Sequence, residues 1–97
     1  MHVITKTRLA AFWRLHPDAE EPLRVWFRIM NQETFTDLIT VRAFFPTADY
    51  VDGLTVFNIG GNKYRLIVDI SYQLGRVYIR HILTHAEYDR NQWKGKR

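Results

Sequence analysis

Residues 55–93 read TVFNIGGNKYRLIVDISYQLGRVYIRHILTHAEYDRNQW, and this stretch decides the fold. Between residues 63 and 72, apolar and polar side chains alternate with the two-residue period of a β-strand. The segment after the Gln73-Leu74-Gly75 turn repeats the alternation, and the turn residues Gly60-Gly61-Asn62 separate an earlier β-rich run from the central one. The pattern therefore predicts an antiparallel meander of three strands, over residues 54–59, 63–72 and 76–83.

The alternation also assigns the two faces of this sheet. One face of the central strand is apolar and predicts the core: Tyr64, Leu66, Val68, Ile70 and Tyr72. In the last strand Val77, Ile79 and His81 occupy the corresponding positions, so His81 is expected to be a hydrogen-bonded structural histidine. If the apolar faces coincide, the opposite face carries Arg65, Tyr78 and Arg80.

A short helix is expected directly after the last strand. Thr84 and Glu87 have the spacing of a capping box, in which each side chain bonds the other's backbone amide, so His85 is the first helical residue. His85, Tyr88 and Asp89 then project from one helix face. The partial positive charge of a helix N-terminus disfavours an imidazolium there, which suits His85 better as a base than as an acid.

The first half of the chain predicts helices that pack on this sheet. Trp13 and Trp26 lie at core spacing in the first two helices, so both are expected to be core residues. Asp18 and Glu21 have the spacing of a second capping box, at the start of the second helix. The expected order begins with a strand over residues 2–5, a helix ending at Leu15 and a helix through Leu23 and Met30. A helix over residues 36–45, which Pro46 stops, and a polar turn over residues 47–53 follow.

Composition sets limits on the class of protein. The 97 residues are expected to form a single domain, residues 1–97. The chain has no cysteine and no apolar run of about 20 residues, which favours a reducing cytoplasm and no membrane. Residues 1–53 carry six Lys/Arg against seven Asp/Glu, whereas residues 54–97 carry eight against three. The basic half is the half with the predicted meander, which indicates a polyanionic partner.

Several chemistries are excluded by spacing. The run from Gly60 to Lys63 is neither a P-loop nor a dinucleotide-binding motif, because a strand follows it. The histidines and carboxylates show no recognised zinc pattern, and His81 and His85 straddle a junction between strand and helix. The sequence therefore predicts no cofactor and no metal site.

The order of elements and the motifs within them resemble a known family. The chain resembles the HigB toxins of bacterial type II toxin-antitoxin modules, in the RelE-like group of ribosome-dependent messenger RNA endonucleases. The resemblance covers nearly the whole chain. Its motifs are Val3-Ile4-Thr5, Phe12-Trp13, the segment from Arg42 to Asp49, the run VFNIGGNxYRLIV, the run VYIRxILTHAEYD and a late Trp93-Lys94.

The resemblance implies an α+β fold with N-terminal helices packed on a small antiparallel sheet and a short C-terminal helix. It implies cleavage of mRNA in the ribosomal decoding site without metal. It also implies a helix-turn-helix, HigA-like antitoxin, through which alone the toxin would reach operator DNA.

The positions that match the family's catalytic elements are Arg65, Arg80, His85 and Tyr88. Lys63, Tyr78, Trp93 and Lys94 are expected to assist RNA binding, and the tail from Asn91 to Arg97 is basic. Metal-free RNA cleavage needs a base for the 2'-hydroxyl, an acid for the departing 5'-oxygen and cations for the phosphorane. In this hypothesis His85 is the base or acid, Tyr88 its partner or a stacking platform, and the two arginines form a phosphate clamp.

Structural alternatives exist for four of these residues. Trp93 could instead dock the last helix onto the sheet, the arginines could pair with Asp69 or Asp89, and His85 could face solvent at the helix start. At the level of function, the alternatives to a toxin endoribonuclease are a non-catalytic module that binds RNA or the ribosome, and a co-repressor of the antitoxin.

Overall fold

The computed structural model describes residues 1–94; residues 95–97, the end of the predicted basic tail, lie outside the described part of the chain. The elements, in chain order, are β1 (His2–Ile4), α1 (Thr7–Leu15), the 3₁₀ helix η1 (Pro17–Ala19), α2 (Glu20–Gln32), α3 (Leu38–Phe44), β2 (Asp49–Val51), β3 (Leu54–Ile59), β4 (Tyr64–Ser71), β5 (Arg76–Thr84) and α4 (His85–Asp89).

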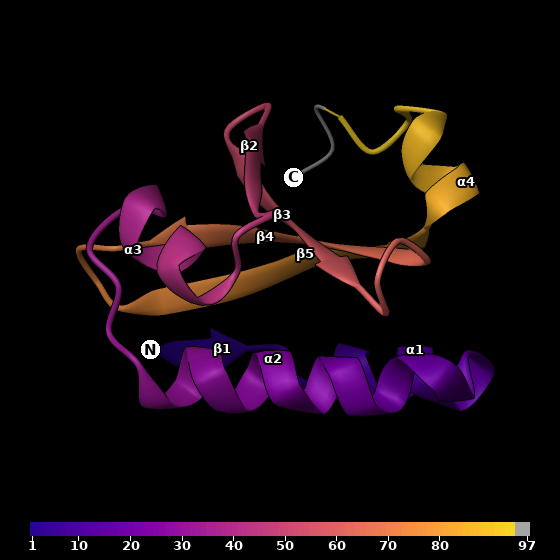
Figure 1. The fold of residues 1–97 in the computed structure, drawn as a ribbon, viewed down its shortest axis with the longest axis horizontal. Coiled ribbons are helices and arrows are strands. Elements are labelled where there is room, and N and C mark those ends of the chain that lie inside the picture. Colours follow the sequence, from indigo (N-terminus) through magenta and orange to yellow (C-terminus); the bar gives the residue numbers. More distant parts are fainter. Residues whose placement is uncertain (95–97) are drawn as a thin grey trace.

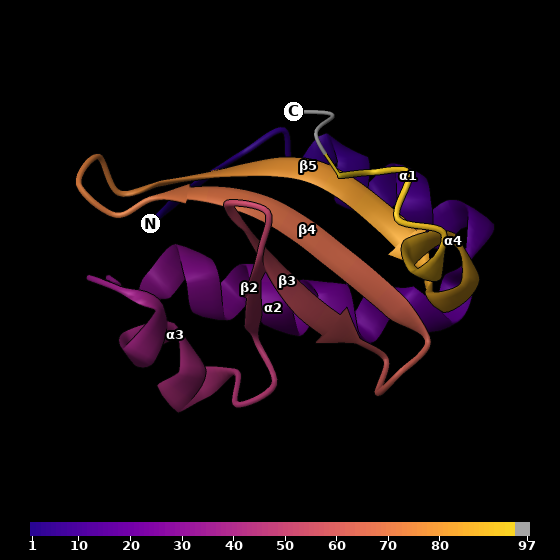
Figure 2. The same ribbon diagram turned by 90° about the horizontal axis from the view of Figure 1, so that it is seen from above.

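The strands form one sheet in the order β1-β5-β4-β3-β2. The predicted meander is confirmed, because β3, β4 and β5 pair antiparallel in sequence, and β2 extends it at one edge. At the other edge β1 pairs parallel with β5, so the sheet is mixed. The helices α1 and α2 lie side by side beneath one face, which we call the α1–α2 face, and α4 rises from the opposite face, which we call the α4 face (Figures 1 and 2). The α+β prediction is confirmed.

The main core lies between the sheet and the two long helices. It is built from the predicted periodic positions: Leu9, Leu23, Trp26 and Met30 on the helices, and Phe57, Leu66, Val68, Val77 and Ile79 on the strands. Trp26 packs edge-on against Phe57 with ring centroids 5.6 Å apart. Trp13 is only partly buried and packs against this core from its edge, with the guanidinium of Arg24 over its ring.

The α4 face holds a second, smaller core that the sequence did not predict. Its buried members are Leu54, Val56, Ile67 and Trp93. The expectation was that only one face of the central strand is apolar. Instead β4 is buried on both faces over its first five residues, because α4 and the segment after it fold back onto the sheet.

The capping box predicted at Asp18 and Glu21 is wrong. Helix α2 begins at Glu20, and no side chain caps its first turn. The carboxylate of Asp18 instead accepts hydrogen bonds from the Tyr64 hydroxyl at 2.6 Å and from Lys63 Nζ at 2.9 Å. These two donors lower the pKa of Asp18. The Asp18 carboxylate, which the predicted capping box would use to cap α2, is therefore occupied by contacts with Lys63 and Tyr64.

The third helix is confirmed with tighter bounds. Asp37 and Thr40 form a capping box at the start of α3, and the helix ends before Pro46. The polar turn expected over residues 47–53 is partly wrong, since Asp49–Val51 forms the edge strand β2. Three residues are too few for a detectable alternation.

Candidate functional site

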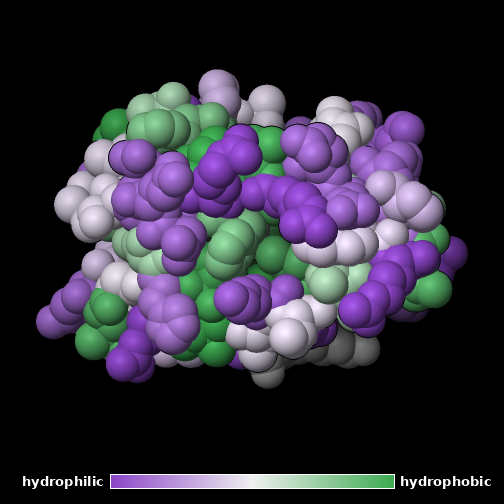
Figure 3. All heavy atoms as spheres, turned by 90° about the horizontal axis from the view of Figure 1, so that it is seen from below, coloured by the Kyte–Doolittle hydropathy of each residue, from purple (hydrophilic) through white to green (hydrophobic). Residues whose placement is uncertain are grey.

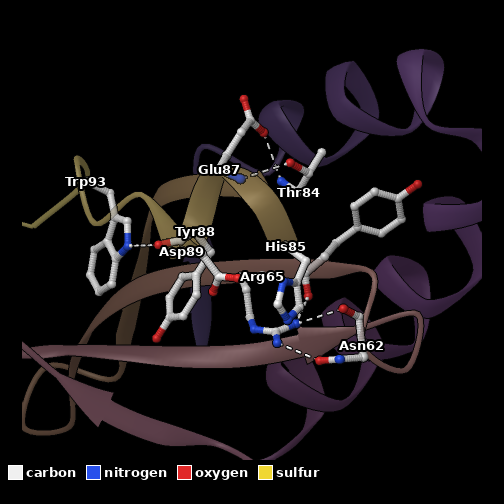
Figure 4. A network of polar contacts seen from close by, with 9 residues as sticks. Asn62, Arg65, Thr84, His85, Glu87, Tyr88, Asp89 and Trp93 are labelled. Carbon is white, nitrogen blue, oxygen red and sulfur yellow. Dashed lines mark hydrogen bonds and ion pairs between the residues drawn. The ribbon is translucent and has the colours of Figure 1, made fainter.

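The residues predicted to act on RNA fall mainly on the α4 face, in two groups. One group surrounds the junction of β5 and α4, where the side chains of Asn62, Arg65, His85, Tyr88 and Asp89 lie close to one another (Figure 4). The other group lies farther back along β5, at Tyr78 and Arg80. Arg80 and His85 are five positions apart, and an extended chain of that length spans roughly 16 Å. The predicted catalytic set is therefore split along the face.

The predicted helix start is confirmed. The Thr84 hydroxyl accepts a hydrogen bond from the Glu87 amide at 3.2 Å, and Glu87 Oε1 accepts one from the Thr84 amide at 2.9 Å. The backbone amide of His85 donates to the carbonyl of Lys63 at 3.0 Å. This bond ties the first residue of α4 to the start of β4, so the position of His85 is fixed from two directions.

His85 contacts a carboxylate on its own helix. Its Nδ1 lies 2.9 Å from Oδ2 of Asp89, and the His85 and Asp89 side chains are 43% and 59% exposed. A carboxylate bound to one imidazole nitrogen fixes the ring orientation and leaves the other nitrogen for proton transfer. The sequence reasoning placed Asp89 on this face but missed it as the partner of His85. The signal was its i, i+4 spacing.

Arg65 is a buried cation, only 8% exposed. Its Nη1 donates to the carbonyls of Asn62 and Tyr64 at 3.2 and 3.1 Å, and its Nη2 donates to Asn62 Oδ1 at 2.6 Å. Neither alternative partner, Asp69 or Asp89, receives these bonds. The guanidinium therefore holds the turn between β3 and β4, where Gly60 and Gly61 both have positive φ angles of 64° and 69°.

Tyr88 lies between this cation and Trp93. Its ring is 5.4 Å from the Arg65 guanidinium carbon and stacks on the Trp93 ring at 5.3 Å. Burial raises the pKa of the Tyr88 phenol, the carboxylates of Asp49 and Asp89 raise it further, and Arg65 opposes them. The hydroxyl therefore keeps its proton at neutral pH and acts as a hydrogen-bond donor.

Trp93 is 3% exposed and belongs to the second core. Its Nε1 donates to the carbonyl of Tyr88 at 3.2 Å. This is the docking arrangement that the sequence left open as the alternative to base stacking. Lys94 follows on the surface, with its ammonium 5.9 Å from the Trp93 ring centroid.

The second group is shaped by a β-bulge. The pairs Ile67–His81 and Val68–Ile79 are consecutive, so Arg80 has no Cα partner on β4. The bulge reverses the alternation after Ile79, which corrects the prediction for His81. His81 lies opposite Ile67 of the second core, with its ring 6.5 Å from that of Trp93, instead of facing the main core.

Arg80, the residue at the bulge, lies over the ring of Tyr78, two positions earlier on β5. Arg80 Nη2 is 3.6 Å from Asp69 Oδ2, the pairing that was its structural alternative. The guanidinium carbon is 5.3 Å from the Tyr78 ring centroid. Within residues 1–94, the buried Arg80 Nε has no hydrogen-bond partner. The Arg80 side chain is 34% exposed, so the accessible part of its guanidinium, beside the Tyr78 ring, is suited to binding a phosphate or a base.

Lys63 is separated from both groups, because its ammonium is paired with Asp18 of η1. Among the residues that the structure describes, no three His, Asp or Glu side chains come together as metal ligands. In the same part of the chain, no helix has the length and apolar character needed to cross a membrane.

Comparison with known proteins gives a consistent family. A sequence model of the HigB toxins, described as the RelE-like toxic component of a toxin-antitoxin system, matches residues 19–91. The mRNA interferase HigB of Escherichia coli O6:H1 (strain CFT073) is 31% identical over 93 residues, which cover 93% of this chain and 90% of that protein. The mRNA interferase toxin HigB of Escherichia coli K12 is 32% identical over 92 residues, covering 92% and 88%.

Proposed function

This chain belongs to the HigB toxin family, and from that premise we propose that it is an endoribonuclease that cleaves messenger RNA on translating ribosomes. The relatives named above are mRNA interferases, which is the first support for RNA cleavage. As the toxic component of such a system, the chain would act in the cytoplasm. Its activity would be restrained by a HigA-like, helix-turn-helix antitoxin that also carries it to operator DNA.

The observation that carries the proposal is the half-exposed pair of His85 and Asp89 beside a buried guanidinium. His85 Nδ1 is held by Asp89 at 2.9 Å. Arg65 and His85 bond to successive carbonyls, those of Asn62 and Lys63, so the cation is anchored next to the histidine. A proton acceptor of fixed orientation close to a fixed positive charge is what cleavage by the 2'-hydroxyl requires.

The chemistry follows from these positions. His85 takes the proton of the 2'-hydroxyl through Nε2, and the negative charge of Asp89 stabilises the imidazolium that forms. The 2'-oxygen forms a bond to phosphorus as the bond from phosphorus to the 5'-oxygen breaks. The Tyr88 hydroxyl, which keeps its proton, donates it to the 5'-oxygen, and the imidazolium later restores that proton. The products are a 2',3'-cyclic phosphate and a 5'-hydroxyl, and no step requires a metal ion.

The cations have separate tasks in this proposal. Arg65 is buried, so it stabilises the phosphorane through its charge and by fixing the turn at Asn62, rather than by gripping the phosphate as a fork. Arg80 lies roughly 16 Å from His85 along β5, and Tyr78 lies beyond it, so this pair binds the RNA away from the scissile phosphate. Lys94 contributes positive charge along the RNA path, whereas the ammonium of Lys63 is paired with Asp18 and the buried Trp93 supports α4.

Dependence on the ribosome is proposed because the site has few acid-base groups. In this proposal His85 and Tyr88 are the two residues of the first group that exchange protons with the RNA. A decoding site would supply an mRNA that is already held in an extended conformation, which lowers the entropic cost of alignment.

The test is primer extension on one defined mRNA, bound to translating ribosomes and free in solution, with wild-type protein and His85→Ala. We expect cleavage on ribosomes only, fragments that carry a 2',3'-cyclic phosphate and a 5'-hydroxyl, and a rate lower by about 100-fold or more for His85→Ala. Ribosome binding by the variant should be unchanged.

Two outcomes would contradict the proposal. Folded wild-type protein that binds ribosomes without cleaving would support a non-catalytic binding module. A chain that neither binds nor cleaves, but strengthens operator binding by the antitoxin, would support a co-repressor.

A further inference from the structure

A groove runs between α1 and α2 on the side of the molecule opposite the candidate site. Its deeper part is a hollow of about 470 Å³ whose floor is Leu9, Ala10, Trp13 and Phe27. A second hollow of about 310 Å³ shares Lys6, Thr7 and Phe27 with the first and continues the groove to Val3 and Ile4 of β1. In Figure 3 this face shows apolar side chains in a depression bordered by hydrophilic ones.

The charges around the groove have one sign. The charged residues that line the two hollows are Lys6, Arg24 and Arg28, and the lining contains no carboxylate. The ammonium of Lys6 lies 5.6 Å from the Phe27 ring centroid, and the guanidinium carbon of Arg24 lies 4.7 Å from that of Trp13. Lys6 and Arg24 thus lie over the aromatic rings of the floor, so a ligand in the groove would contact an aromatic ring and a positive charge at the same time.

We propose that this groove is a docking site for an acidic, amphipathic segment of the antitoxin. The segment would place apolar side chains on the floor formed by Trp13 and Phe27, and carboxylates against Lys6 and Arg28. The partner's existence rests on the chain's membership of a toxin-antitoxin family. The chemistry of its segment rests on the groove, which offers apolar anchor positions and a basic rim. In that rim Arg24 is paired with Glu20 at 2.8 Å, and Lys6 and Arg28 are exposed.

The groove fits a protein segment better than RNA. Trp13 and Phe27 can stack on bases and the basic rim can meet phosphates, but Leu9 and Ala10 in the same floor offer no hydrogen bond to a base and suit apolar side chains. It also lies on the α1–α2 face, whereas His85, at the start of α4, lies on the opposite face (Figures 1 and 4). An RNA strand bound at the candidate site does not need this surface.

Isothermal titration calorimetry of the full chain with the antitoxin of its own module tests the proposal. The double variant Lys6→Glu, Arg28→Glu should raise Kd by about 100-fold, because both exposed cations become repulsive. Arg28→Lys keeps the charge and should bind within about threefold of wild type. Arg90→Glu, an exposed charge reversal on the α4 side, is the matched control and should leave Kd within the same range.

Binding by the double variant at wild-type affinity would overturn the proposal, as would an equal loss for Arg90→Glu. Cleavage on ribosomes by the double variant, without antitoxin, should equal wild type. A loss of cleavage with unchanged antitoxin affinity would instead assign the groove to RNA or the ribosome. The binding measurement does not use catalysis, so failure of the endoribonuclease proposal would leave it interpretable.

Discussion

Leu66 and Ile67 are neighbours on β4, yet their side chains are buried in two different cores. Leu66 lies in the main core beneath α1 and α2, and Ile67 lies in the second core with Trp93. The main core extends under most of the sheet. The second covers only part of the α4 face and leaves Tyr78 and Arg80 partly exposed beside it. The difference indicates that the α1–α2 face of the sheet mainly stabilises the fold. The α4 face holds both a small core and the candidate site.

The largest expected effect separates these two cores directly. Leu66→Ala should lower the free energy of unfolding by about 2–5 kcal/mol, because both long helices hold the cavity open. Ile67→Ala should lower the free energy of unfolding by about 1 kcal/mol less, because the short helix α4 can move into the cavity that the substitution leaves. Urea unfolding of both variants measures the difference. An equal or larger loss for Ile67→Ala would contradict the comparison.

Trp93→Phe should act mainly on the site. It keeps an aromatic ring but removes the hydrogen bond to Tyr88, at a cost of about 1–2 kcal/mol. Amide hydrogen exchange should become faster in α4 than in β4, and ribosome-dependent cleavage should fall because α4 carries His85. Unchanged exchange in α4, with global stability lowered by the same amount, would show that Trp93 does not hold this helix.

The two capping motifs give a smaller, matched pair. Thr84→Ala should destabilise the protein by about 1 kcal/mol, because the capping box at α4 is formed. Glu21→Ala should change stability by no more than about 0.5 kcal/mol, since Glu21 does not cap α2. Thermal unfolding of both variants compares them. An equal loss of stability in both variants would mean that Asp18 and Glu21 do form a capping box at the start of α2.

The smallest effect is a pH dependence at Asp18. Hydrogen bonds lower the pKa of Asp18, and the Asp18 carboxylate raises the pKa of Tyr64. The lowered carboxyl pKa gives a stabilisation that is present above about pH 4 and is lost as pH falls through the folded value. The raised phenol pKa gives one that is present below about pH 10 and is lost as pH rises through the folded value.

Asp18→Asn removes both contributions. The free energies of unfolding of wild type and variant, measured from pH 2 to 11, should therefore differ most between about pH 5 and 9, and the difference should shrink toward both ends. A difference that is constant across this range would contradict the assignment.

Much of the fold follows from local patterns in the sequence. The alternation in residues 54–83 gave β3, β4 and β5, the helical spacing gave α1 and α2, and the pair Thr84 and Glu87 gave the start of α4. These signals depend on residues close together in the chain, and so they can be read without tertiary information.

Apart from the short strand β2, the errors arise where contacts between residues distant in the sequence determine the structure. Asp18 binds Tyr64, 46 residues away, in place of its own helix. The bulge at Arg80 moves His81 to the other face, and no pattern in the strand marks it. Arg65 was expected on the solvent-exposed face of the sheet. It is buried because Asn62 accepts its hydrogen bond and the Tyr88 ring covers its guanidinium.

The most direct measurement of the central claim is a double-mutant cycle on His85 and Asp89. Single-turnover cleavage of ribosome-bound mRNA would be measured for wild type, His85→Ala, Asp89→Asn and the double variant. If the pair transfers the proton as one unit, Asp89→Asn alone should slow cleavage by about 10-fold or more, and should have no further effect once His85 is alanine. Equal slowing by Asp89→Asn in both backgrounds, or no slowing in either, would contradict the proposed role of the pair.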